Sequence, residues 1–85
     1  MAAETRVLRR LRELASLYGK SSPGTVIPLT QGDIAGLAAT SRATVNRVLR
    51  AEERRGTVRL ARGKTIVLDP GEIARRAGSA ALDRA

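Results

Sequence analysis

Three consecutive residues in the second half of the chain, Gly63-Lys64-Thr65, have the composition of a phosphate-binding loop. In a P-loop this triplet follows a glycine placed five residues earlier and precedes a helix whose N-terminus faces the phosphates. Here the earlier position is Val58, and the residues after Lys64 read TIVLD, which is typical of a strand. Both requirements fail. We therefore exclude a nucleotide-binding loop and expect Lys64 to contact a different phosphate.

Catalytic chemistry has little support elsewhere in the sequence. The 85 residues include no cysteine and no histidine, which removes thiolate nucleophiles, thiolate metal sites and the commonest general base. The carboxylates suggest no acid–base pair in a pocket; those considered are Asp33, Glu52, Glu53, Asp69 and Glu72. We predict that the chain is not an enzyme, and that it holds no metal and no cofactor of its own.

The charge is the clearest functional signal. Sixteen lysines and arginines against eight aspartates and glutamates give a net charge of +8, which favours a polyanionic partner. Readers of RNA and single strands usually stack bases on aromatic side chains, and this chain has only Tyr18, so we expect duplex DNA. No signal peptide is visible, and prolines interrupt the longest uncharged stretch, 21–32. We therefore expect a cytoplasmic protein that does not span a membrane.

The first third of the chain predicts one helix and one short strand. Apolar residues at helical spacing indicate a helix over 4–18 that ends at Gly19. We expect its apolar face to comprise Val7, Leu8, Leu11, Leu14 and Tyr18. A loop over 20–24 leads to a β-branched strand over 25–27, and Pro28 implies either an edge strand or the end of the strand.

Two helices separated by a tight turn follow this strand. Thr30 is the expected N-cap of the first helix and Asp33 completes a capping box, with Ile34, Leu37 and Ala38 as the apolar face. After a turn at 39–40, Ser41 caps a longer helix over 42–55 that ends at Gly56. Its inner face is expected to contain Val45, Val48 and Leu49. A short helix, a turn and a capped helix are typical of a helix-turn-helix.

A β-hairpin directly after these helices makes the winged form of that motif. We expect strands over 57–60 and 65–68 with a turn at 62–63, and then a helix that begins with Asp69-Pro70. The predicted fold is mainly α with a small antiparallel sheet (α+β), a winged helix-turn-helix. The predicted divisions are a flexible arm 1–5, the DNA-binding domain 6–77 (helix-turn-helix 30–55, wing 57–68, C-terminal helix 70–77) and a frayed tail 78–85.

The basic residues concentrate in the same unit. Residues 42–64 hold eight basic side chains against Glu52 and Glu53; the basic ones are Arg42, Arg47, Arg50, Arg54, Arg55, Arg59, Arg62 and Lys64. A run of charge is usually just a solvated face. Here it lies on a capped helix and the hairpin after it, which favours contact with DNA.

The segment LTQGDIAGLAATSRATVNRVL, followed by RGKTIVLD, resembles the C-terminal DNA-binding domain of the Crp–Fnr regulators, over about residues 6–77. The resemblance implies that Ser41 and Thr44 contact phosphate and that Arg42 and Arg47 read bases in the major groove. Arginine pairs bidentately with guanine, and residues at the start of a recognition helix reach base edges, so the chemistry agrees. Asn46 could pair with adenine or only face solvent.

The expected interface contains two groups of residues. Base readout is assigned to Arg42, Ala43, Asn46 and Arg47. Phosphate contact is assigned to Thr30, Gln31, Ser41, Thr44, Arg50, Arg62 and Lys64.

Three positions depart from the family's pattern. Ala43 stands where several well-known members carry glutamate, so it can touch a thymine methyl but cannot accept a hydrogen bond from cytosine. Ala39 stands where the turn often has glycine, and a left-handed conformation there would be strained. Glu52 stands where the family usually buries an apolar residue, and we expect it to reach the rim of the core and pair with an arginine.

The resemblance also implies partners. Family members carry an N-terminal sensor and a long dimerisation helix, so we expect either an excised output domain of a ligand-gated regulator, the alternative we favour, or a stand-alone reader. The expected partner is duplex DNA with a pseudo-palindromic site, with RNA polymerase as a further partner. We expect a monomer for the isolated domain and a homodimer for the full-length protein, whose sensor would bind a cyclic nucleotide or another effector. A winged-helix protein-interaction module, with a basic face for an acidic partner, is the alternative function.

Overall fold

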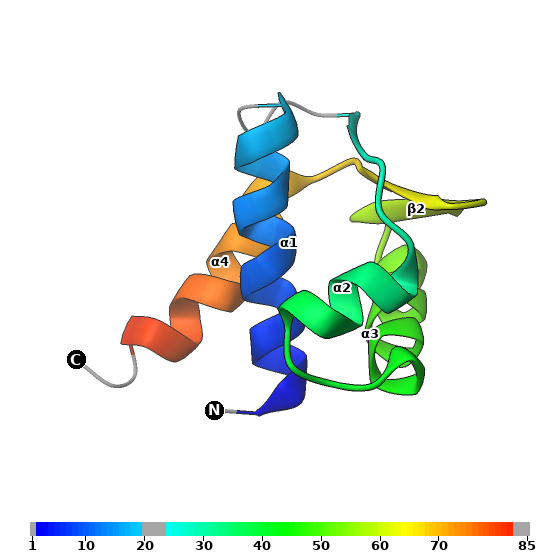
Figure 1. Cartoon of the computed structure of the whole chain (residues 1–85). Coiled ribbons are helices and arrows are strands. Elements are labelled where there is room, and N and C mark those ends of the chain that lie inside the picture. Colours follow the sequence, from blue (N-terminus) through cyan, green and yellow to red (C-terminus); the bar gives the residue numbers. More distant parts are fainter. Residues whose placement is uncertain (1, 20–23, 83–85) are drawn as a thin grey trace.

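The computed structural model describes residues 2–19 and 24–82 and shows a winged helix-turn-helix (Figure 1). The α+β fold class is therefore confirmed. The elements, in chain order, are α1 (Ala3–Gly19), β1 (Thr25–Ile27), α2 (Gln31–Leu37), α3 (Arg42–Arg54), β2 (Val58–Ala61), β3 (Lys64–Val67) and α4 (Pro70–Leu82). The loop expected over 20–24 lies outside the described residues except for Gly24.

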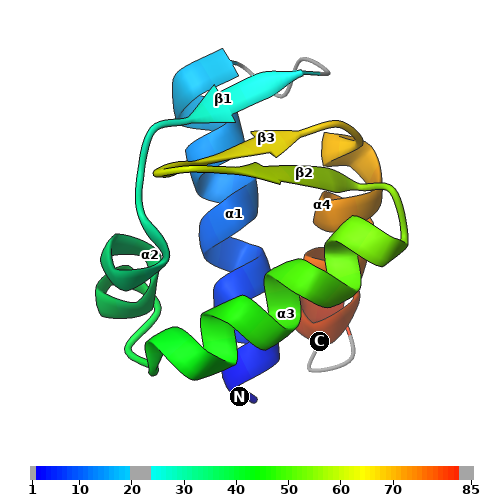
Figure 2. The ribbon, with the colours of Figure 1, turned by 90° about the vertical axis from the view of Figure 1, so that its right-hand side faces the viewer.

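Helix α1 runs behind α2, α3 and the sheet in the view of Figure 2 and supplies much of the core. The prediction of a flexible arm over 1–5 is wrong for 3–5, because α1 begins at Ala3. Tyr18 was expected in the apolar face but is 47% exposed, whereas Ala15 is buried. The last turn of α1 lies so close to β1 that a Cβ added at Gly19 would meet the Thr25 side chain at 2.2 Å. The end of α1 is therefore in close contact with β1, and this contact requires glycine at position 19.

The sheet has three antiparallel strands in the order β1-β3-β2. Ile27 and Leu60 both lie opposite Thr65, one on each side of the central strand. Strand β1 is at the edge, one of the two arrangements that Pro28 implied, because proline cannot donate to a further strand. The hairpin turn between β2 and β3 contains Gly63 at φ +71°, a conformation that favours glycine.

Local capping determines where α2 and α3 begin. Thr30 Oγ1 accepts from Asp33 N at 3.1 Å while Asp33 Oδ2 accepts from Thr30 N at 3.0 Å, which completes the predicted capping box. Leu37 was expected on the buried, apolar face of α2 but is 44% exposed, and Ala35 is buried instead. A seven-residue helix offers too few positions for apolar spacing to fix its orientation.

Two arginines of α1 hold the C-terminal end of α2. Arg6 donates from Nε to the carbonyl oxygen of Ala38 at 2.9 Å and from Nη2 to that of Ala39 at 3.2 Å. Arg10 donates from Nε to the carbonyl oxygen of Leu37, also at 2.9 Å. The last carbonyls of a helix lack intrahelical donors, so these guanidinium groups satisfy them and attach α2 to α1.

Helix α4 begins as predicted and ends later. Asp69 Oδ1 accepts from Glu72 N at 3.1 Å, which caps the first turn, and a hydrogen bond from Arg75 holds the pKa of Glu72 below its usual value. The predicted end at 77 and frayed tail over 78–85 are wrong for 78–82, because α4 continues to Leu82. One glycine costs a helix only about 1 kcal/mol relative to alanine, so Gly78 does not have to end it.

Glu52 is the largest correction to the expected core. It does not reach the rim: its relative exposure is 1%, and it lies in the last turns of α3. Its carboxylate accepts from Arg55 Nη1 at 2.9 Å, from Thr57 Oγ1 at 2.7 Å and from Arg76 Nη2. The expected pairing with an arginine is confirmed, and it allows the charge to be buried.

Candidate nucleic-acid interface

Helix α3 lies across one face of the molecule, with the hairpin of β2 and β3 beside it (Figure 2). Val45, Val48 and Leu49 are buried, as predicted, so the opposite side of α3 faces solvent. That side exposes Arg42, Ala43, Arg47 and Arg50. The residues expected to read bases therefore start at the N-terminal end of an accessible helix, where they can enter a groove.

Two of the residues predicted to contact phosphate, Ser41 and Thr44, are bonded to each other at the N-cap of α3. Ser41 Oγ accepts from Thr44 N at 3.1 Å and donates to Thr44 Oγ1 at 3.0 Å. Ser41 is exposed and Thr44 is partly buried. The two hydroxyl groups are thus held together at the point where α3 begins.

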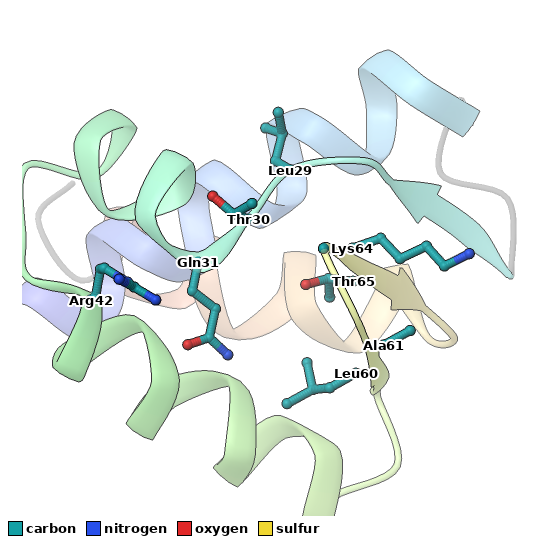
Figure 3. Close-up of a pocket in the computed structure, with 9 residues that line it drawn as sticks. Leu29, Thr30, Gln31, Arg42, Leu60, Ala61, Lys64 and Thr65 are labelled. Atoms are coloured by element: carbon teal, nitrogen blue, oxygen red, sulfur yellow. The ribbon is translucent and has the colours of Figure 1, made fainter.

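Four predicted interface residues surround one hollow. It has a volume of about 250 Å³ and lies between the start of α2, the start of α3 and the hairpin; its lining includes Thr30, Gln31, Arg42 and Lys64. Figure 3 shows the Arg42 side chain extending from α3 toward Gln31, whereas the Lys64 side chain points away from both. Arg42 therefore brings positive charge to the hollow from the start of α3, whereas the charged end of Lys64 lies away from it.

The side chain of Asn46 does not face only solvent, and its amide is hydrogen-bonded within the protein instead of being free to contact a base. Its Nδ2 donates to Gln31 Oε1 at 3.2 Å, and both residues are partly buried. A residue assigned to base readout is thus bonded to one assigned to phosphate contact. The bond links the first turn of α2 to the middle of the recognition surface.

Two further arginines of α3 are paired with glutamates. Arg50 Nη1 lies 3.1 Å from Glu53 Oε1 on the same helix. Arg47 Nη1 lies 3.4 Å from Oε1 of Glu4, which belongs to the first turn of α1. Both pairs are exposed to solvent, so the two arginines keep access to a partner at the surface.

The hairpin presents positive charge without acidic residues. Between residues 57 and 68 the charged side chains are Arg59, Arg62 and Lys64, and all three are exposed. The nearby acids turn toward the protein: Glu52 is buried among arginines, and Glu53 Oε2 accepts from Leu60 N at 3.4 Å. The predicted concentration of charge is therefore available at the surface.

The structure gathers Thr30, Gln31, Arg42 and Lys64 around the hollow and places Arg47 and Arg50 further along α3. Arg62 lies at the hairpin turn, between β2 and β3. Sequence reasoning missed Glu4, whose partner Arg47 is 43 residues away. No local pattern could have indicated this pair, because it depends on how α1 packs against α3.

Other kinds of site find no support in the part of the chain that the structure describes. Over residues 2–19 and 24–82, no three side chains of the metal-binding types gather into a group that could hold an ion. Within the same ranges, no helix combines the length and the apolar character needed to cross a membrane.

Comparisons with known proteins agree with this geometry. The Crp-like helix-turn-helix domain family matches residues 5–76. The CRP-like cAMP-activated global transcriptional regulator of Mycobacterium tuberculosis is 37% identical over 75 residues, which are 85% of this chain and 34% of the relative. The Thermus thermophilus catabolite activator protein superposes with a TM-score of 0.77 at 32% identity, over 91% of this chain and 34% of that one.

A second solved structure gives the same result. Another transcriptional regulator from Thermus thermophilus, of the CRP/FNR family, has a TM-score of 0.77 at 26% identity, over 88% of this chain and 40% of that chain. The chain thus spans about a third of the length of the curated relatives it matches.

Proposed function

The chain belongs to the Crp-like helix-turn-helix family, and we propose that it binds duplex DNA sequence-specifically as the output domain of a ligand-gated transcriptional regulator. The observation that carries the proposal is the exposed N-terminal half of α3, with Arg42 and Arg47 accessible and a basic hairpin beside it. A major groove about 12 Å wide admits one α-helix, and α3 is accessible along its outer side.

We infer that base recognition comes from the first half of α3. Arg42 and Arg47 each have a guanidinium fork that can donate two hydrogen bonds to guanine. Ala43 can contact a thymine methyl and makes no hydrogen bond, so the base pair next to Arg42 is read by its shape. To pair with adenine, Asn46 would have to break its hydrogen bond with Gln31. Otherwise, it would hold Gln31 in position to contact the DNA backbone.

We infer that phosphate contacts flank this reading surface on both sides. Ser41 and Thr44 can bind one strand at the start of α3, and Thr30 and Gln31 lie beside them across the hollow. Arg50 extends the basic side of α3, while Arg62 and Lys64 can reach the backbone from the hairpin. Contacts of this kind fix the register of a protein on DNA and carry no sequence information themselves.

The partners of the whole protein belong to the same proposal. The relative from Mycobacterium tuberculosis is a cAMP-activated regulator, and on that basis we propose that a longer form of this chain carries a sensor for a cyclic nucleotide or another effector. A homodimer would place two copies of α3 on a pseudo-palindromic site, and RNA polymerase is a further proposed partner.

Selection from a random duplex library tests the proposal directly. We expect one enriched half-site, and we expect Arg42→Ala to weaken binding to it by about 1–3 kcal/mol and to relax the preference at one base pair. Arg75→Ala is the matched control, because Arg75 is an exposed arginine of α4 whose partner is Glu72. An unchanged selection profile for Arg42→Ala would remove this residue from base readout.

A binding comparison with the same protein distinguishes DNA binding from the alternative function, a protein-interaction module. If the basic face serves an acidic protein, the chain should bind an acidic polypeptide at least as tightly as random duplex at matched salt. We expect the opposite order, because duplex DNA carries about one charge per 1.7 Å and a protein that neutralises its phosphates releases condensed counterions.

A further inference from the structure

We propose that Glu4 is an affinity-determining residue of the DNA interface, because its carboxylate competes with DNA for the guanidinium of Arg47. The inference rests on the proposed function. It adds a residue of α1 to an interface otherwise built from α2, α3 and the hairpin.

The contact joins the two elements directly. Arg47 Nη1 lies 3.4 Å from Glu4 Oε1, and the two side chains are 62% and 63% exposed. Arg47 is on the outer side of α3, among the residues expected to face a groove. The pair is therefore open to the same space that a DNA duplex would enter.

The core of the domain fixes Glu4 in this place. Val7 and Leu11 follow Glu4 on α1 at helical spacing, and both are fully buried. A groove of about 360 Å³ along the back of α3 is lined by Glu4 together with Val48 and Ala51. Glu4 thus lies beside α3 because α1 packs there, at a distance from which it can pair with Arg47.

Binding to DNA would make this pair unfavourable. Arg47 needs its guanidinium fork for a bidentate contact with a base, and a carboxylate that shares the fork withdraws donors and neutralises charge. The complex therefore requires Arg47 to leave Glu4, and free protein in which the pair is formed is less competent to bind.

A simpler role for Glu4 has to be separated from this one. An acidic residue in the first turn of a helix is stabilised by the helix dipole, so Glu4 also favours α1 itself. That contribution affects folding and is independent of Arg47. Measuring DNA affinity in the presence and absence of the arginine therefore distinguishes the two roles.

The test is a double-mutant cycle of Glu4→Gln and Arg47→Ala, with affinity measured by fluorescence anisotropy on the duplex that the wild type selects. We expect Glu4→Gln to tighten binding by about 1.5-fold to fivefold, the range for breaking an exposed ion pair. In the Arg47→Ala background, we expect Glu4→Gln to give no gain beyond that of the control. The control is Glu13→Gln, another exposed glutamate of α1, which pairs with Arg10 at 3.0 Å.

Each other outcome overturns the proposal. An equal gain in the Arg47→Ala background would mean that Glu4 only repels DNA through space. Weaker binding by Glu4→Gln would mean that Glu4 positions Arg47 for readout. If the wild type selects no duplex, the proposed function fails as well. If the wild type does select a duplex, and Arg42→Ala loses affinity while Glu4→Gln is neutral, only the inference about Glu4 fails.

Discussion

Ala39 lies between α2 and α3 with φ at +53°, a left-handed conformation that an alanine adopts at a cost of about 1–2 kcal/mol. The turn adopts this conformation as the chain closes the end of α2 with backbone hydrogen bonds from Ala39 N to Gly36 O at 3.3 Å and from Thr40 N to Ala35 O at 3.0 Å. Ala39 is exposed, so its methyl group adds little packing in return. The backbone is thus strained in the turn between α2 and α3.

We expect Ala39→Gly to stabilise the domain by about 0.5–1 kcal/mol. Glycine removes the left-handed strain, and its greater freedom in the unfolded chain offsets only part of that gain. Urea denaturation followed by circular dichroism would measure the free energy of unfolding. Ala51→Gly, in the middle of α3, is the control and should lower that free energy by about 1 kcal/mol. A destabilised Ala39→Gly would show that the turn is not strained.

Local signals at single residues determined how much of the fold could be predicted. Thr30, Ser41 and Asp69 each cap the helix predicted after them, because a cap depends on a few neighbouring residues. The ion pair of Glu4 with Arg47 could not be predicted, since it joins elements far apart in sequence. The base and phosphate roles assigned to the interface residues stay predictions.

At the scale of elements, the buried carboxylate of Glu52 joins three parts of the fold. It lies on α3, accepts from Thr57 just before β2, and pairs with Arg76 of α4. Thr57 also accepts from the backbone amides of Leu68 and Asp69, between β3 and α4. The carboxylate of Glu52 therefore links α3 both to the start of the hairpin and to α4.

We expect Glu52→Gln to lower the free energy of unfolding by about 3 kcal/mol. This is the low end for a broken buried ion pair, because Arg76 is one-fifth exposed and Arg55 is more exposed still, so water can solvate both in part. The matched control is Glu53→Gln, which breaks an exposed pair with Arg50 and should cost less than about 1 kcal/mol. Equal losses in the two variants, measured by urea denaturation, would contradict a special role for Glu52.

The hairpin should act on DNA through charge alone. We expect Arg62→Ala and Lys64→Ala to weaken binding to selected and random duplexes alike, because phosphate contacts carry no sequence information. Each lost contact should reduce the slope of log K against log salt by about 0.9. Titrations at several salt concentrations measure the slope, with Arg75→Ala as control. A loss confined to the selected duplex would mean that the hairpin reads bases.

At the scale of the whole molecule, the proposed function assigns one copy of the domain to one half-site. The extents of the domain are 37 × 27 × 23 Å, and its longest dimension is close to one turn of duplex, about 34–36 Å. It presents one reading helix, α3, so a single copy can occupy one major-groove segment. A symmetrical site would need a second copy.

We expect the 85-residue chain to sediment as a monomer of 9.1 kDa and to bind a single half-site weakly. Two copies joined by a flexible linker should bind an inverted repeat about 10²–10⁴ times more tightly than one copy, because the second contact becomes intramolecular. Analytical ultracentrifugation and titration of one-site and two-site duplexes would measure both effects. A tight dimer of the single chain would contradict this arrangement.

The attachment of α2 to α1 has a consequence for protein engineering. Arg6 and Arg10 hold helix carbonyls through their Nε atoms, an arrangement that needs the planar fork of arginine. Lysine at either position would keep the charge and lose this geometry. A project that reduces non-specific adhesion by trimming positive charge should therefore spare these two positions together with the arginines proposed to contact DNA, and start with an exposed arginine such as Arg75 of α4.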